Sequence, residues 1–413
     1  MPGVADRTSL SIEATYDVDV EISVGTGEIA VQTVIGLRNE SGGPIDRVEL
    51  NAIAARLGRM TISGTTVDGL AVTASVDDQT ITVPLGGILP DGASTNLELT
   101  YRATLKDDLA NSDWLFSRAG GTIAMYRWIP WISRAIPFDR PNFGDPFETS
   151  SSPRVQVRVT TDSPMVLASP GSRPTVEGLI TTFEVTNVRD VAIVLAPDFV
   201  ETTGTVDGVE VRSYTRPGGL EPARVMAQAE RALSGIAGQL EVPYPWATFT
   251  IAETAGGYGM ESPEAIWLPR QTLRGNLAYL IHHETAHQWF YGLVGNDQQA
   301  EPFADEAAAD FVARTVLGTL RGSRCVVAPL DRAITRYSAS CYYEVVYIQG
   351  GEVLDAIRRH MGDAAFWAAL RGYLEDHRFG IGGTRALLQS LVDGSTVDLG
   401  PILRARFPSL FGS

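Results

Sequence analysis

The chain has 413 residues, of which 44% are hydrophobic and 20% charged, and its formal net charge is −16. This length predicts two or three domains, and the acidic balance argues against nucleic acid or an anionic membrane as a partner, because phosphate binding requires a basic face. No apolar run approaches the roughly 18 residues of a membrane span, so an integral membrane segment is not expected.

Residues 8–105 alternate apolar and polar positions in short runs such as ATYDVDVEISV, which are separated by turn sequences such as ESGGP. A period of two predicts antiparallel strands joined by hairpins. After an aromatic and proline-rich crossing at 125–147, the alternation returns and continues to about residue 215. We therefore expect residues 1–205 to form an all-β domain with an antiparallel, sandwich-like architecture.

Beyond Pro217 the apolar spacing becomes helical. Two strands are still expected, at 248–254 and 264–269, and they flank the turn AGGYGMESP. The remaining periodic segments predict helices at about 274–293, 302–319, 343–360, 363–377 and 383–394. Residues 206–413 are therefore expected to form a second, mainly helical α+β domain.

The segment IHHETAHQW, at 281–289, contains three of the five histidines of the chain. On a helix, His283 and His287 project from the same face one turn apart and can share one metal ion. Glu284 then points beside the metal, where it can hold and deprotonate a water molecule. This spacing is the His-Glu-x-x-His arrangement of zinc hydrolases; the alternative is a solvated polar helix face.

A catalytic zinc ion requires a third protein ligand and one open position. The segment AEPFADEAAADF, at 300–311, supplies several carboxylates, and Glu306 follows His287 by 19 positions. That distance allows a turn and a second antiparallel helix to bring Glu306 back over the histidines. Asp310, one turn later, is a candidate acceptor for the free ring N–H of a ligating histidine; the alternative is a charge on the helix surface.

Three motifs now resemble one family. HETAHQWFYGLVG, at 283–295, followed by Glu306, resembles the zinc signature of the aminopeptidase N and leukotriene-hydrolase family of gluzincin metallopeptidases. GGYGMESP, at 256–263, resembles its Gly-x-Met-Glu-Asn exopeptidase motif, and VYIQGGEVLDAIRRHMG, at 346–362, resembles its Tyr-Glu-Lys-Gly segment. The resemblance implies a saddle-like N-terminal β domain, a thermolysin-like catalytic domain, and one Zn²⁺ per chain bound by His283, His287 and Glu306.

The same resemblance implies three further roles. Glu284 activates water, Glu261 binds the free α-amine of a substrate, and Tyr347 donates to the transition state, with Tyr342 and Tyr343 as close rivals. It thus implies an aminopeptidase for peptides with a free N-terminus. The chain ends about where the catalytic domain of that family ends, so we expect the large C-terminal helical domain to be missing.

Other interpretations remain open. Without that C-terminal domain an endopeptidase or a peptidase of broader specificity is an alternative, and a non-catalytic binding or scaffold protein on the same fold is an alternative from another class. Ser262 and Gln349 replace the asparagine and the lysine of the family motifs, so the family roles of those residues are not assumed here.

Cys325 and Cys341 lie 16 positions apart. They are expected to form one disulfide in an oxidising compartment or to be two thiols in a reducing one. The start of the chain, MPGVADRTSL, lacks the basic end and the apolar core of a secretory leader. An extracytoplasmic location, with the leader absent from this chain, is favoured over a cytoplasmic one, and the oligomeric state is left open.

Overall fold

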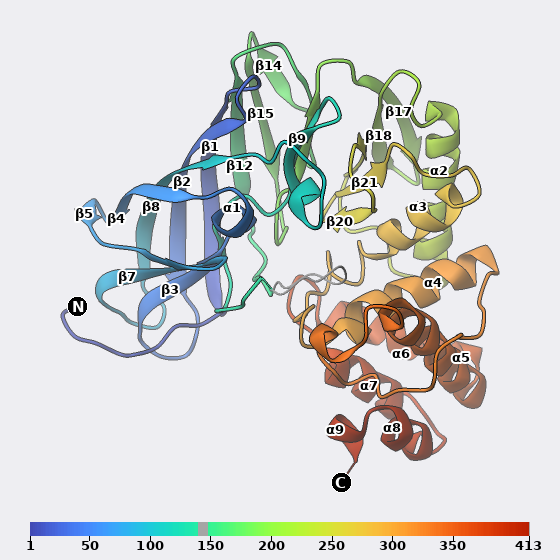
Figure 1. The fold of residues 1–413 in the computed structure, drawn as a ribbon. Helices are drawn as coiled ribbons and strands as arrows, with labels where there is room; N and C mark the ends of the chain where they lie inside the picture. Colours follow the sequence, from blue (N-terminus) through green and yellow to red (C-terminus); the bar gives the residue numbers. More distant parts are fainter. Residues whose placement is uncertain (139–147, 413) are drawn as a thin grey trace.

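The structure is a computed structural model that describes residues 1–138 and 148–412. Its N-terminal part consists mainly of strands, and most of its helices gather in the C-terminal part (Figure 1). The predicted order, a β-rich region followed by a mainly helical one, is confirmed. Residues 139–147, which belong to the predicted proline-rich crossing, lie outside the described residues.

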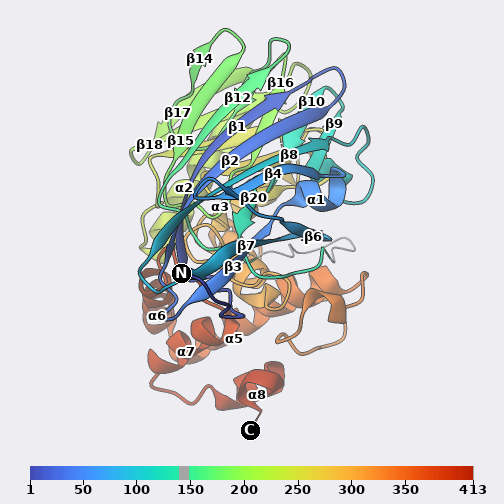
Figure 2. The ribbon, with the colours of Figure 1, turned by 90° about the vertical axis from the view of Figure 1, so that its left-hand side faces the viewer.

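The largest sheet has eight strands in the order β14-β15-β12-β1-β2-β8-β4-β5, and Figure 2 shows its long strands side by side. In β1 (Ile12–Ile22) the even-numbered side chains are buried, as the alternating sequence predicts. Neighbouring strands are antiparallel, except that β1 and β12 run parallel. The other strands are β2 (Glu28–Asn39), β4 (Thr61–Val67), β5 (Leu70–Ala71), β8 (Ser94–Thr104), β12 (Val155–Thr161), β14 (Thr175–Glu177) and β15 (Ile180–Val185).

Two four-stranded sheets complete the N-terminal part, in the orders β13-β16-β10-β9 and β11-β3-β7-β6. Their buried side chains share one hydrophobic core with the large sheet. The strands are β3 (Ile45–Asn51), β6 (Ser75–Asp77), β7 (Thr80–Leu89), β9 (Phe116–Ala119), β10 (Thr122–Met125), β11 (Trp131–Ile132), β13 (Val166–Ala168) and β16 (Ile193–Ala196). Two short helices, α1 (Ile53–Leu57) and a 3₁₀ turn at Asp113–Leu115, lie between them in sequence.

A five-stranded mixed sheet opens the second part, in the order β17-β18-β19-β21-β20. Both predicted strands of this part are present within one residue of their expected bounds. The strands are β17 (Val200–Val206), β18 (Val209–Thr215), β19 (Thr248–Thr254), β20 (Met260–Ser262) and β21 (Ala265–Pro269). Because β17 pairs with β18, the expected boundary after residue 205 falls inside a strand of this sheet; the division into domains at that point stays a prediction.

The helical region has its own hydrophobic core, which includes the inner face of the sheet. Two segments within it are π-helical turns, Phe303–Ala307 and Glu344–Gln349, and each leads directly into an α-helix. The two short C-terminal helices, α8 and α9, were not predicted. The α-helices are α2 (Pro222–Leu240), α3 (Leu277–Ala286), α4 (Ala308–Leu317), α5 (Gly350–Met361), α6 (Asp363–Asp376), α7 (Thr384–Asp393), α8 (Gly400–Arg406) and α9 (Pro408–Phe411).

Cys325 and Cys341 form a disulfide, so the structure selects one of the two states that the sequence left open. The bond ties the loop after α4 to the residues that precede the second π-helical turn. Gln349 reinforces the connection, because its Nε2 donates to the carbonyl oxygens of Cys325 and Val326 at 3.1 and 3.0 Å. Within the described residues, we find no helix with both the length and the apolar character needed to cross a membrane.

Candidate active site

The two histidines of the motif face each other across one helical turn. The expected helix at 274–293 is shorter than predicted: α3 ends at Ala286, and His287 follows it with helical backbone angles (φ −62°, ψ −12°). The i, i+4 relation therefore survives at the end of the helix, and the Nε2 atoms of His283 and His287 lie 3.3 Å apart. After His287 the chain continues in wider turns, in which the amides of residues 292–294 donate to the carbonyl oxygens of residues 287–289, five positions earlier.

Glu306 completes a convergent set of three ligand atoms. It lies in the π-helical turn before α4, where an extra residue per turn directs its side chain toward α3. Its Oε2 is 3.4 Å from His283 Nε2 and 3.3 Å from His287 Nε2. Although burial alone would raise the pKa of Glu306, hydrogen bonds with His283 and His287 hold that pKa well below its usual range. The site therefore presents an ionised carboxylate to the two rings.

These atoms fit a zinc ion. Two imidazole nitrogens and one carboxylate oxygen, all buried and within 4.8 Å of one another, match the ligand set of a catalytic zinc. The outer nitrogen of His287 is also engaged: Nδ1 lies 2.8 Å from Asp305 Oδ1. An N–H on Nδ1 leaves the lone pair of Nε2 directed at the shared centre, as a metal ligand requires.

Asp305 therefore has the role for which Asp310 was a candidate. Asp310 lies 4.0 Å from His283 Nδ1, too far for a hydrogen bond. It accepts instead from the Tyr279 hydroxyl at 2.6 Å and from Arg314 Nε at 2.7 Å. In a regular helix through Glu306, the partner of the ligating histidine would lie one turn later, at Asp310. The π-helical turn at Phe303–Ala307 instead places the Asp305 carboxylate against His287.

Glu284 is a buried carboxyl group beside the three ligand atoms, only 4% exposed. Burial, the nearby charge of Glu261 and that of Glu306 raise its pKa to about 8, against an opposing effect of His283 and His287. A carboxyl group with a raised pKa is well suited to exchange protons near neutral pH. Gly259 leaves room for this side chain, because a Cβ at that position would lie 2.2 Å from Glu284 Oε1.

Glu261 lies on the edge strand β20, which pairs with β21 on one side. Its carboxylate is 4% exposed, and one of its oxygens lies within 4.8 Å of a ring nitrogen of His287 and an oxygen of Asp305. The structure thus places Glu261 beside His287 and Asp305, next to the three proposed ligands. Its neighbour Ser262, which replaces the asparagine of the motif, donates its hydroxyl to Asp190.

Tyr347 is the tyrosine of its segment that faces the ligands. Burial and the adjacent Glu306 carboxylate raise the pKa of its hydroxyl well above 10, and its ring lies 5.5 Å from that of His283. The two alternative candidates for this role have other contacts. The Tyr343 hydroxyl forms hydrogen bonds with Arg314 and Tyr279, and Tyr342, which is 1% exposed, packs in a small hydrophobic core.

Comparisons with known proteins bear on the fold of the chain. No protein-family model matches the chain. A mutant of the M1 zinc metallopeptidase of Deinococcus radiodurans superposes with a TM-score of 0.72 at 19% identity, over 95% of this chain and 94% of that one. The same mutant bound to a Tyr-Ser-Ala substrate gives a TM-score of 0.70 at 19% identity, over 95% and 93%.

Two curated proteins are also similar in sequence. Aminopeptidase M1-A of Oryza sativa subsp. japonica is 22% identical over 374 residues, which are 78% of this chain and 41% of that protein. Aminopeptidase N of Lactococcus lactis subsp. lactis is 25% identical over 150 residues, which are 30% and 18%. The matches thus span less than half the length of these curated relatives.

The fold is that of the M1 zinc metallopeptidases. The predicted resemblance to the aminopeptidase N family is thereby confirmed at the level of fold and of β-to-helical order.

Proposed function

We propose that the chain is a zinc aminopeptidase that hydrolyses the first peptide bond of peptides with a free N-terminus. One observation carries the proposal: the ligand atoms of His283, His287 and Glu306 meet at one buried centre. Two further buried carboxyl groups, Glu284 and Glu261, lie near that centre. A zinc ion held there would supply Lewis acidity toward a water molecule and toward the peptide carbonyl.

Glu284 is the proposed proton carrier. The positive charge of a zinc ion bound beside it would favour the ionised form of this carboxyl group. The Glu284 carboxylate then accepts a proton from the attacking water as the water oxygen bonds to the peptide carbonyl carbon. It then gives that proton to the leaving nitrogen as the carbon–nitrogen bond breaks, so protons balance over the reaction. The Tyr347 hydroxyl, protonated at neutral pH because its pKa is raised, donates to the developing oxyanion.

Glu261 is the proposed anchor for the substrate amine. A buried carboxylate is costly unless a positive charge or hydrogen bonds compensate it, and the α-ammonium group of a peptide supplies both. Because β20 is an edge strand, its outer side can also pair with the extended backbone of a peptide. Free-amine substrates are therefore preferred over N-acetylated ones.

Aminoacyl amides with free and acetylated amines test the proposal, assayed with and without a chelator. Glu284→Gln should retain one zinc per chain and lose turnover, whereas Glu261→Ala should retain slow turnover and lose the preference for a free amine. Efficient internal cleavage of acetylated peptides, unchanged in Glu261→Ala, would instead identify an endopeptidase. A purified chain that takes up no zinc would exclude both.

We also propose an extracytoplasmic location. The Cys325–Cys341 disulfide supports it, because such bonds persist in oxidising compartments and are rare in the cytosol. Thiol labelling of the protein in its native cells tests this: blocked cysteines are expected, and two free thiols would place the protein in a reducing compartment.

A further inference from the structure

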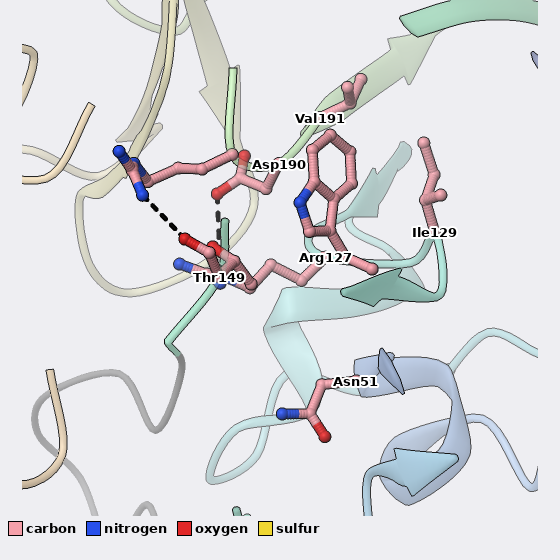
Figure 3. A pocket seen from close by; sticks show the side chains of 8 residues that line it. Asn51, Arg127, Ile129, Thr149, Asp190 and Val191 are labelled. Carbon is pink, nitrogen blue, oxygen red and sulfur yellow. Dashed lines mark hydrogen bonds and ion pairs between the residues drawn. The ribbon is translucent and has the colours of Figure 1, made fainter. Parts of the chain in front are cut away.

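A buried polar cluster connects the β-rich part to the active site. It is centred on Arg127, which follows β10 and whose side chain is 4% exposed. Figure 3 shows Arg127 and Asp190 beside a small cavity, joined by a dashed line; their Nε and Oδ2 atoms are 3.6 Å apart. The cavity of about 10 Å³ holds at most one water molecule. The cluster is therefore packed side chain against side chain and is not itself a ligand site.

Arg127 reaches across to the catalytic part through one nitrogen. Its Nη2 donates to the Tyr291 hydroxyl at 2.5 Å and to Gln298 Oε1 at 3.1 Å. Tyr291 in turn donates to Asp190, which also accepts from Ser262. Ser262 is next to the proposed amine anchor, so the cluster touches the anchor strand at one point and Gln298 at another.

The guanidinium group determines how the Gln298 amide is oriented. Since an arginine only donates, the amide must turn its oxygen toward Arg127, and its NH₂ group then points the other way. On that side Nε2 donates to Asp305 Oδ2 at 2.7 Å and to Glu261 Oε1 at 3.2 Å. Each of the two amide protons is used on one carboxylate.

Two carboxylates this close repel each other unless a donor lies between them. Gln298, which is 2% exposed, is the neutral donor shared by Glu261 and Asp305. It thus connects the residue proposed to bind the substrate amine with the residue that orients His287.

Two residues of the same cluster have strained backbone conformations, which is an observation independent of the hydrogen bonds. Arg127 has φ +40° and Tyr291 has φ +125°, both outside the conformations that L residues favour. Such strain persists where the surrounding contacts over-determine a conformation, and it is enriched at functional sites.

We propose that Gln298, oriented by Arg127 from the β-rich part, is a positioning residue that holds Glu261 in place to receive the α-ammonium group of the substrate. This inference rests on the proposed aminopeptidase function. It implies that the β-rich part contributes to substrate selection through a buried hydrogen-bond chain.

Gln298→Glu is the direct test, because it keeps the size of the side chain, removes both donors and adds a third carboxylate. For free-amine aminoacyl amides we expect KM to rise roughly tenfold to a hundredfold, the scale of one hydrogen bond to a charged group, with little change in kcat. Acetylated substrates have no α-ammonium group, so their KM should rise less than that of the free-amine substrates. Gln298→Met, which has similar volume without charge, should give a smaller rise. Gln299→Glu is the matched control, because it places the same charge one residue further, at a partly exposed position.

The outcomes separate the two proposals. Parent values of KM in both Gln298 variants would overturn this inference and leave the aminopeptidase function standing. Equal losses of kcat on free and acetylated substrates would indicate a purely structural role and would also overturn it. No turnover of free-amine substrates by the parent would overturn the proposed function and this inference together. If Gln298→Glu fails to fold, Gln298→Met decides by the same criteria, with zinc content and Tm as checks of the fold.

Discussion

Gly259 is the position at which one methyl group probes the catalytic geometry most directly. A Cβ at this residue would lie 2.2 Å from Glu284 Oε1, 2.7 Å from Glu284 Cδ and 2.8 Å from Leu280 Cδ1. Non-bonded heavy atoms are best separated by about 3.5–4.0 Å. Gly259→Ala must therefore displace the Glu284 carboxylate by more than about 1 Å, because the nearest clash is with that group.

The size of the effect follows from this displacement. Moving a catalytic group by about 1 Å can cost about a hundredfold in rate, and a general base contributes about 10²–10⁴-fold. We expect kcat of Gly259→Ala to fall by at least about a hundredfold. Overpacking costs about 1–3 kcal/mol, less than the roughly 5–15 kcal/mol that keeps a typical protein folded, so the variant should fold and bind zinc.

The assay is kcat on a free-amine aminoacyl amide, with zinc content and Tm measured in parallel. Gly257→Ala is the matched control from the same turn, since a Cβ there would meet no described atom within 4 Å. We expect the control to behave like the parent. A parent-like kcat in Gly259→Ala would refute the assignment of Glu284 as proton carrier, and equal losses in both variants would attribute the effect to the turn as a whole.

Three other variants test separate parts of the structure. Tyr347→Phe should keep zinc and lower kcat about a hundredfold, the usual effect of losing one oxyanion donor; an unchanged kcat would assign the oxyanion to another group. Burial raises the pKa of Glu264 from 4.5 to about 7, so the stability that its neutral form contributes is complete below about pH 4.5 and is lost as the pH rises through about 7. The Glu264→Gln side chain is neutral at every pH. Its free energy of unfolding, measured with urea, should therefore increase by about 3 kcal/mol relative to that of the parent when the pH is raised from 4 to 8; an equal difference between variant and parent at both pH values would contradict this. Replacing Cys325 and Cys341 by serine should lower the free energy of unfolding by about 3 kcal/mol, because the bond closes a loop of this length; equal stability of the variant and the oxidised parent would refute it.

Local periodicity in the sequence was sufficient to predict several structural features of this protein. The alternation in β1 and its neighbours depends only on a two-residue repeat, and the facing of His283 and His287 depends only on a helical turn. Both predictions hold even when the predicted ends of an element are wrong by a few residues. Although α3 ends at Ala286, earlier than expected, His287 keeps helical backbone angles, and the two Nε2 atoms lie 3.3 Å apart. The 19-residue spacing between His287 and Glu306 likewise predicted a carboxylate close to the histidine pair, and Glu306 Oε2 lies 3.4 and 3.3 Å from the Nε2 atoms of His283 and His287.

Other features were decided only by packing between distant segments. The choice of Asp305 over Asp310 depends on a π-helical turn, and periodicity does not distinguish such a turn from a regular helix. Arg127 and Gln298 lie 171 positions apart, and neither belongs to a local pattern that marks function. Their contact exists because the β-rich part and the catalytic part pack together at the active site, and the sequence alone carries no local signal for which buried donor will meet which carboxylate across that junction.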